Sequence, residues 1–284
     1  MIFGRRRRKW WLIAAALLVI VAVFVGYGFA ETYRLEIKEY TFASPDLPVE
    51  FDGTRVVFVS DIHRGMFFSE DRVRSVAARV AALDPDLVLL GGDYVYMDTS
   101  NAASCFAGLA ELDAPLGCYA VLGNHDYGEH DDDSGPGLVI QAIADSDIEI
   151  LRNEAVWIEK GGARIRVGGV GDYTEDVHDV DPTLEGTAET DFVLLMSHNP
   201  DMAEYLPDDS VDLMLSGHTH GGQVTFFGLR ALHVPSDFGQ KYRTGVVRTE
   251  ATTVIVSNGV GASGILPIRF FARPQIVLLH LHRK

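Results

Sequence analysis

The sequence has only two cysteines in 284 residues, Cys105 and Cys118, and this scarcity excludes several kinds of site. Two thiols are too few for a cysteine-based zinc site or for a disulfide-rich fold. Neither lies in a segment that suggests catalysis. Outside the cytosol the pair could form one disulfide. A helix predicted around Cys105 and a strand beginning at Cys118 instead favour two buried thiols.

Basic residues are also scarce beyond the first thirty positions. The chain has 24 basic and 40 acidic residues, for a formal net charge of −16. Five basic residues and no acidic one precede residue 31, which leaves 19 basic against 40 acidic residues, or −21, in the remainder. This acidity argues against a nucleic-acid polymer as a partner but permits a small anionic substrate. The sequence has no internal repeat or low-complexity tract, and it leaves the oligomeric state open.

A single long apolar run lies near the N-terminus, where Arg5-Arg6-Arg7-Arg8-Lys9 precedes an uncharged stretch from Trp10 to Ala30. About 20 apolar residues are enough to span a bilayer as a helix. Because basic flanks stay in the cytosol, we expect residues 1–30 to form a signal anchor and residues 31–284 to form one domain at the outer side of the cell membrane. Gly28-Phe29-Ala30 also fits a signal-peptidase site, which leaves a cleaved leader and a secreted domain open. Consecutive arginines leave twin-arginine export open as well.

Five short polar segments follow five apolar runs in a fixed order along the rest of the chain. The runs are typical of buried strands. Because the carboxyl ends of strands in an α/β sheet share one crevice, we expect the polar segments to meet there. The strands are expected at 56–59, 87–90, 119–122, 192–196 and 211–215, and the segments are Asp61-Ile62-His63, Gly92-Asp93, Gly123-Asn124-His125-Asp126, His198 and Gly217-His218-Thr219-His220.

Together these segments offer carboxylates, an amide oxygen and several imidazoles, but no thiolate. This set suits divalent cations such as Mn, Fe or Zn, and it does not single out zinc. Taken alone, Asp61-Ile62-His63 and Gly92-Asp93 are as typical of ordinary turns as of metal sites. The paired His218 and His220, flanked by glycines, form the strongest single signal. Five such segments in order argue against a purely structural explanation.

In these five segments the chain resembles the calcineurin-like metallophosphoesterase superfamily, whose pattern is D-x-H, G-D, G-N-H-[DE], H and G-H-x-H. It is most similar to a membrane-linked or exported prokaryotic phosphodiesterase branch, through Asp52-Gly53-Thr54-Arg55-Val56 and the stretch Ile268-Arg269-Phe270-Phe271-Ala272-Arg273-Pro274. The resemblance covers about residues 33–282. It implies an α/β fold, a four-layer α/β/β/α sandwich in which two mixed sheets face each other and helices cover the outside.

The resemblance also implies two divalent metal ions and a role for each motif residue. A hydroxide held between the cations would attack the phosphorus atom. His125 would stabilise the transition state or protonate the leaving group, and Asp126 would orient His125. One metal would bind Asp61, His63 and His220, the other would bind Asn124, His198 and His218, and Asp93 would bridge the two.

We therefore expect a metal-dependent phosphoric ester hydrolase that cleaves a phosphodiester or pyrophosphate bond. The expected anchor makes a lipid-linked or cell-envelope phosphoester the leading substrate candidate. An exported phosphomonoesterase or nucleotidase of the same fold is the alternative, since the walls of the cleft decide between monoesters and diesters. A non-catalytic metal-stabilised binding module is a further alternative, and it leaves His125 and Asp126 unexplained. An envelope scaffold is another, and it needs none of the polar ligands.

Other segments carry weaker predictions. Helices are expected at 69–83, with Ser69 as N-cap, at 102–112 and at 138–144. A hairpin is expected around Gly161-Gly162, and the acidic stretch 172–190 reads as a surface loop rather than a substrate-facing cap. Arg64 could pair with a substrate phosphate or be a solvated loop residue. The histidines expected to face solvent are His130, His178, His233, His280 and His282.

Overall fold

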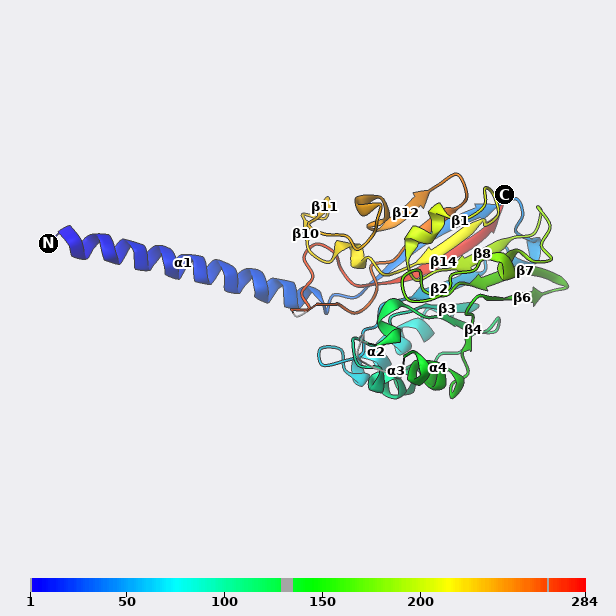
Figure 1. Ribbon diagram of the computed structural model, residues 1–284, viewed down its shortest axis with the longest axis horizontal. Coiled ribbons are helices and arrows are strands. Elements are labelled where there is room, and N and C mark those ends of the chain that lie inside the picture. The colour runs from blue at the N-terminus through cyan, green and yellow to red at the C-terminus, as the bar shows by residue number, and fades with distance from the viewer. Residues whose placement is uncertain (1, 129–134, 265) are drawn as a thin grey trace.

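The computed structural model describes residues 2–128, 135–264 and 266–284, and within them two six-stranded mixed sheets pack face to face (Figure 1). The predicted surface histidine at position 130 lies outside these residues. A two-stranded ribbon and a long N-terminal helix complete the molecule. The expected α/β architecture of two facing mixed sheets is confirmed.

The first sheet contains three of the five strands that carry the polar segments. Strands β2 to β5 run parallel to one another, while β14 is antiparallel to β2 and parallel to β1. The order across the sheet is β1 (Glu36–Ser44), β14 (Gln275–Arg283), β2 (Arg55–Val59), β3 (Leu87–Gly91), β4 (Cys118–Val121) and β5 (Glu149–Ile150).

The second sheet contains the other two strands that carry polar segments. Its four central strands are parallel, and an antiparallel strand closes each edge. The order is β12 (Gly245–Arg248), β13 (Thr253–Val256), β9 (Leu213–Ser216), β8 (Val193–Met196), β7 (Ala163–Gly169) and β6 (Glu154–Lys160). The predicted hairpin is β6 and β7, turning at Gly161 and Gly162. The separate ribbon pairs β10 (Thr225–Phe226) with β11 (Arg230–Ala231).

Each central strand is buried on both faces, which explains why it appears in the sequence as an unbroken apolar run. In β2, Val57 and Val59 pack against the outer helices, while Val56 and Phe58 pack between the two sheets. The outer helices on this side are α2 (Glu70–Ala81), α3 (Ala102–Leu109) and α4 (Gly137–Ala144). Ser69 caps α2 as predicted, since its side chain accepts a hydrogen bond from the Arg72 amide at 3.4 Å. Cys105 and Cys118 are buried free thiols, as expected.

The outer face of the second sheet has a thinner cover. It consists of the short helices α5 (Asp181–Leu184), η4 (Pro200–Glu204) and η6 (Gly239–Tyr242), with apolar side chains packed on β8, β9 and β13. The stretch 172–190, expected to be a plain surface loop, contains α5, whose Thr183 is fully buried beside Gly168 of β7. This stretch therefore belongs to the fourth layer of the fold.

The helix α1 (Ile2–Glu31) extends away from the rest of the molecule (Figure 1). Its segment Lys9–Glu31 is long and apolar enough to cross a membrane. Only its last turns touch the folded part of the chain. The Phe24 ring stacks on the Phe270 ring with centroids 4.0 Å apart, and the Phe271 amide donates a 3.1 Å hydrogen bond to Oε2 of the buried Glu31. The base of α1 is therefore packed into the structure.

Candidate metal centre

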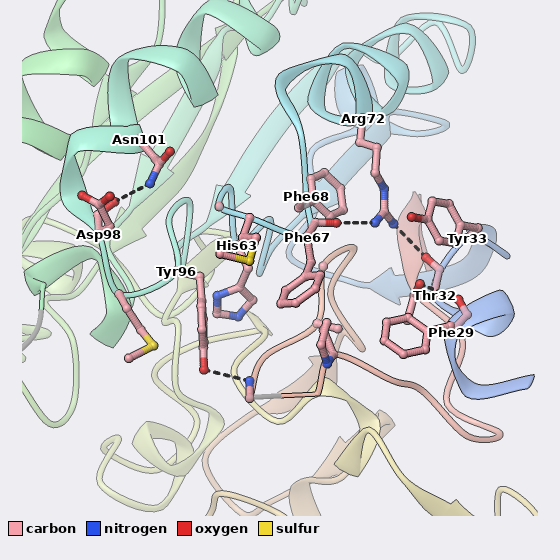
Figure 2. Close-up of a pocket in the computed structure, with 17 residues that line it drawn as sticks. Phe29, Thr32, Tyr33, His63, Phe67, Phe68, Arg72, Tyr96, Asp98 and Asn101 are labelled. Atoms are coloured by element: carbon pink, nitrogen blue, oxygen red, sulfur yellow. Dashed lines mark hydrogen bonds between the residues drawn. The ribbon is translucent and has the colours of Figure 1, made fainter. Parts of the chain in front are cut away.

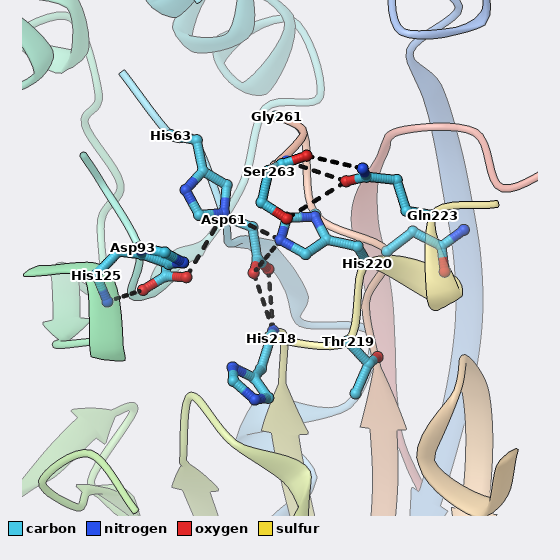
Figure 3. A network of polar contacts seen from close by, with 12 residues as sticks. Asp61, His63, Asp93, His125, His218, Thr219, His220, Gln223, Gly261 and Ser263 are labelled. Carbon is cyan, nitrogen blue, oxygen red and sulfur yellow. Dashed lines mark hydrogen bonds and ion pairs between the residues drawn. The ribbon is translucent and has the colours of Figure 1, made fainter. Parts of the chain in front are cut away.

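Loops at the carboxyl ends of β2, β3 and β4 in one sheet, and of β9 in the other, converge on one site (Figure 3). The loop after β8 joins them through the contact of His198 with Asp93. These loops carry the five predicted polar segments. Asp61, His63, Asp93, His198 and His220 are buried, and Asn124, His125 and His218 are half-buried. Segments up to 159 positions apart in the sequence, from Asp61 to His220, thus share one small volume.

Asp61, His63 and His220 form the tightest group. The Nε2 atoms of His63 and His220 lie 3.0 Å apart, and His220 Nε2 lies 3.4 Å from Asp61 Oδ1. Burial lowers the pKa of His63 to about 3 and the pKa of His220 well below its usual value, so both rings are neutral at pH 7. Two neutral imidazoles that direct nitrogen lone pairs at the same place as a carboxylate fit the donor set of a divalent cation.

Asp93 lies between this group and His198. Its Oδ2 atom is 3.5 Å from His63 Nε2 and 3.3 Å from His198 Nε2. Burial alone would raise the pKa of the Asp93 carboxyl, but His198, His125 and His63 hold it well below its usual value. An ionised carboxylate between two sets of imidazoles has the geometry that a bridging ligand needs.

The remaining three predicted ligands also lie together. His218 Nδ1 and Asn124 Oδ1 are 2.9 Å apart, and the His218 and His198 rings meet edge to face with centroids 5.1 Å apart. His198 Nδ1 donates a 2.7 Å hydrogen bond to the Gly91 carbonyl, which directs Nε2 into the site. Burial would lower the pKa of His198, yet Asp93 holds it well above its usual value. A cation shared with Asp93 would replace that proton.

Five of these residues have left-handed backbone conformations, which residues other than glycine rarely adopt. The φ values are 54° for Asp61, 51° for His63, 57° for Asp93, 67° for His218 and 52° for His220. Each such conformation costs about 1–3 kcal/mol and persists only where the surrounding structure imposes it. Strain concentrated on the ligand-type residues is typical of a functional site.

Asp126 has partners that differ from the expected ones. Its carboxylate accepts hydrogen bonds from the backbone amides of Asp93 at 2.8 Å, Tyr94 at 2.8 Å and Gly123 at 2.9 Å. Among the described residues, its hydrogen bonds go to backbone amides and none joins it to the His125 ring. Asp126 therefore holds the loops after β3 and β4 together. These contacts do not show Asp126 orienting His125 directly.

His125 lies at the edge of the cluster. Its ring centroid is 5.0 Å from that of His63 and 5.1 Å from that of Tyr96, and its amide donates a 2.9 Å hydrogen bond to Asp93 Oδ1. The half-buried imidazole thus faces the site, and one of its nitrogens lies within 4.8 Å of ligand atoms of His63 and Asp93. Tyr96 belongs to no motif, so no sequence signal marked it as part of the site.

A buried arginine behind the metal site, Arg269, is another structural residue that the sequence did not indicate. Arg269 is fully buried and donates hydrogen bonds to the carbonyls of Asn258 at 2.6 Å, Gly261 at 2.6 Å and His220 at 3.1 Å. Its Nη2 atom also lies 3.2 Å from His220 Nδ1. Arg269 thereby joins a sixth loop, which follows β13, to the back of His220. No local pattern marks an arginine between apolar residues as buried.

Residues outside the motifs remain apart from the cluster. The half-buried Arg64 donates a 2.9 Å hydrogen bond from Nη1 to the Gly65 carbonyl, and its Nε is buried, so Arg64 is not the solvated loop residue considered above. His233 is exposed, and His178, His280 and His282 are half-buried. In the part of the chain that the structure describes, none of these histidines belongs to a group that could hold a metal ion.

Comparisons with known proteins show a matching family and several relatives. Residues 54–222 match the family described as Calcineurin-like phosphoesterase. The chain is 30% identical over 262 residues to the metallophosphoesterase YkuE of Bacillus subtilis, covering 90% of each chain. It is 30% identical over 228 residues to the phosphodiesterase YaeI of Escherichia coli, covering 80% of this chain and 82% of the relative. It is 24% identical over 320 residues to the UDP-2,3-diacylglucosamine pyrophosphatase LpxG of Chlamydia muridarum, covering 91% and 93%.

Proposed function

The chain belongs to the calcineurin-like phosphoesterase family, and from this premise we propose that it cleaves a phosphodiester or pyrophosphate bond in a membrane-associated substrate. The family assignment makes it a hydrolase that acts with two divalent metal ions. The observation that carries the finer proposal is the convergence of seven ligand-type side chains from both sheets. Relatives named phosphodiesterase and pyrophosphatase support the choice of bond.

We assign one cation to Asp61, His63 and His220 and the other to Asn124, His198 and His218, with Asp93 shared. When bound, such cations would polarise a phosphoryl oxygen and lower the pKa of a water molecule, making it a nucleophile for the phosphorus atom. The chain supplies the rigid frame. The Gly91 carbonyl orients His198, and the His218 amide donates a 3.0 Å hydrogen bond to Asp61 Oδ1. Ligands held in this way need little rearrangement during the reaction.

His125 is the side chain that we assign to proton transfer. It is half-buried, it faces the cluster and it is left over once the seven ligands are assigned. An imidazole at this place can stabilise charge that develops on the phosphoryl group or protonate the departing oxygen. Asp126 contributes indirectly, because it fixes the loops that carry Asp93 and His125.

The proposed location is the outer side of a membrane, with residues 1–30 retained as an anchor and residues 31–284 as the catalytic domain. Arg5 to Lys9 precede the apolar span, which favours a cytosolic N-terminus. The packing of Phe24 on Phe270, together with the hydrogen bond from the Arg269 amide to the Gly28 carbonyl, favours an uncleaved segment over a leader removed after Ala30. A lipid-linked substrate fits this location.

An activity panel on the full-length protein in amphipol tests the proposal. We expect bis-p-nitrophenyl phosphate to be hydrolysed faster than p-nitrophenyl phosphate in the presence of Mn²⁺. We expect EDTA to abolish turnover and added Mn²⁺ to restore it, because the neutral imidazoles and ionised Asp93 bind cations rather than substrate. Diester turnover far below monoester turnover would establish a phosphomonoesterase instead. Activity that survives chelation would contradict the metal assignment.

Replacing His125 separates proton transfer from metal binding. In His125→Ala we expect kcat for the diester to fall by about 10²–10⁴, the usual contribution of a general acid or base, while the bound metal measured by mass spectrometry stays the same. His233→Ala, at an exposed histidine that belongs to none of the motifs, serves as the control and should match the unmodified protein. An unchanged rate in His125→Ala would remove this residue from catalysis.

A further inference from the structure

A pocket of about 400 Å³ opens beside the metal centre (Figure 2). His63 lines the pocket and also belongs to the metal cluster. Tyr96 forms part of the same wall, with its ring centroid 5.4 Å from that of His63, and its hydroxyl accepts a 2.9 Å hydrogen bond from the Gly264 amide. One end of the pocket therefore lies where a phosphoester bound to the metals would be held.

The opposite end of the pocket is formed by the base of α1. Phe29 lies in the last turn of this helix, and Thr32 and Tyr33 follow it directly. In Figure 2 these residues lie on the side of the pocket where the α1 ribbon enters, and His63 and Tyr96 lie farther from that ribbon. The candidate membrane span Lys9–Glu31 ends within this wall. The pocket thus connects the place where the helix would leave a bilayer with the metal centre.

The walls between these ends are mainly apolar. Two loops contribute Met66, Phe67 and Phe68 from one side and Met97 from the other. Met66 is 92% exposed, Phe67 48% and Met97 41%, so the mouth presents large apolar side chains to the surroundings. Apolar residues gathered at the mouth of a pocket are typical of a binding surface, and methionines adapt to occupants of varied shape.

The guanidinium in the pocket lining already has partners. Arg72 Nη1 donates a 3.0 Å hydrogen bond to the Phe67 carbonyl, and Nη2 donates a 2.9 Å hydrogen bond to the Thr32 carbonyl. The same group lies over the Tyr33 and Phe68 rings, 4.3 Å and 4.1 Å from their centroids. Arg72 therefore ties one wall of the pocket to the segment that follows α1, and apolar contact is what the pocket mainly offers to an occupant.

We propose that this pocket binds a hydrocarbon chain of a membrane lipid whose phosphoester group reaches the metal centre. The inference rests on the proposed phosphoesterase function and narrows its substrate class. A hydrocarbon chain matches the apolar walls, needs no hydrogen-bond partner and can enter from the bilayer beside α1 without crossing water. A soluble nucleotide would place its base and sugar against Phe67, Phe68 and Met97, which offer these polar groups no side-chain hydrogen bonds. The polar side chains of Asp98 and Asn101 in the lining already make hydrogen bonds within their own loop.

A chain-length series distinguishes this inference from the function on which it rests. The substrates are p-nitrophenyl alkyl phosphodiesters, from methyl to octyl, with the full-length protein in amphipol and Mn²⁺. We expect kcat/KM to rise with each added methylene, by up to about fourfold, because each buried methylene contributes about 0.8 kcal/mol. Hydrolysis that is equally fast for all chains would overturn the lipid pocket and leave the phosphodiesterase function intact. Hydrolysis of none of them would overturn the function itself.

Charged substitutions in the wall locate the effect. In Phe67→Glu and Met97→Glu we expect the ratio of octyl to methyl kcat/KM to fall by at least about tenfold, because a carboxylate at the wall disfavours the apolar chain. Leu138→Glu is the matched control, since Leu138 is 47% exposed but lies on α4. It should keep the chain-length dependence of the unmodified protein. An unchanged ratio in both wall variants would overturn the inference.

Photolabelling gives a readout that does not depend on turnover. An alkyl phosphonate with a diazirine at the end of its chain, added to metal-depleted full-length protein, should label peptides that contain residues 65–68 or 96–98. Unlabelled methyl phosphonate, which lacks the long alkyl chain, should compete poorly with the probe for labelling. Octyl phosphonate without the diazirine should compete well. Labelling confined to other peptides would overturn the inference.

Discussion

At the scale of single residues, the glycines of the motifs supply space for the carboxylates as well as turns. A Cβ atom on Gly217 would lie 2.3 Å from Asp61 Oδ2, and one on Gly123 would lie 2.3 Å from Asp93 Oδ1. No side chain fits at such a distance. The carboxylates of Asp61 and Asp93 can therefore keep their positions only if these two residues lack a side chain.

Adding one methyl group at Gly217 should consequently weaken the metal centre. In Gly217→Ala we expect the affinity for Mn²⁺ to fall by about 10–100-fold, as it does when a residue that supports a metal ligand is changed. Calorimetric titration of the metal-depleted protein measures this affinity. Gly137→Ala is the control, because a Cβ atom there would have no neighbour within 4 Å. Normal Mn²⁺ affinity in a folded Gly217→Ala protein would contradict the argument.

At the scale of secondary-structure elements, α1 is connected to the back of the metal centre. The Arg269 amide donates a 3.1 Å hydrogen bond to the Gly28 carbonyl, while the Arg269 guanidinium binds the His220 carbonyl. The Phe270 ring beside it packs on both Phe24 and Tyr27. Removing α1 would expose this aromatic surface and leave the Arg269 segment without its helix partner.

We therefore expect the mature protein to retain α1. Intact mass measurement on protein purified from the membrane fraction should give a mass that includes the apolar span. A peptide that crosses the junction between Ala30 and Glu31 should also be recovered after proteolysis. The physical reason is that cleavage there would separate Phe24 and Tyr27 from their partners in the folded part of the chain. A mature chain that begins at Glu31 would contradict this prediction.

At the scale of the whole molecule, the metal centre joins the two sheets. Loops of the first sheet provide Asp61, His63, Asp93 and Asn124, and loops of the second provide His198, His218 and His220. A cation bound by residues from both sheets binds the folded state and not the unfolded chain. Metal binding should therefore stabilise the whole fold.

Thermal unfolding with and without metal tests this link. At a free Mn²⁺ concentration of about 100 times Kd, binding adds about 2.7 kcal/mol to the free energy of unfolding. For a domain of this size we expect EDTA to lower Tm by about 5–10 °C. In His63→Ala, which removes a ligand but no contact between the strands, the difference between the two conditions should shrink. A Tm that does not respond to EDTA would show that the cations do not hold the sheets together.

Local sequence patterns were enough to predict the strands, the start of one helix and the types of residue in the metal site. The strands β2, β3, β4, β8 and β9 were predicted because a strand buried on both faces must be apolar throughout. The start of α2 was predicted because an N-cap hydroxyl and a periodic apolar face are local features. The residue types after each strand, together with a family resemblance, indicated the ligand set that the structure brings together.

Other features depend on three-dimensional packing and leave no local signature. Asp126 binds amides about 30 positions away, and Arg269 reaches the carbonyl of a residue 49 positions earlier. The pocket beside the metal centre joins the end of α1 to loops near residues 66 and 97. Periodicity and residue type record what one segment prefers, whereas burial, hydrogen-bond partners and cavities arise only where distant segments meet.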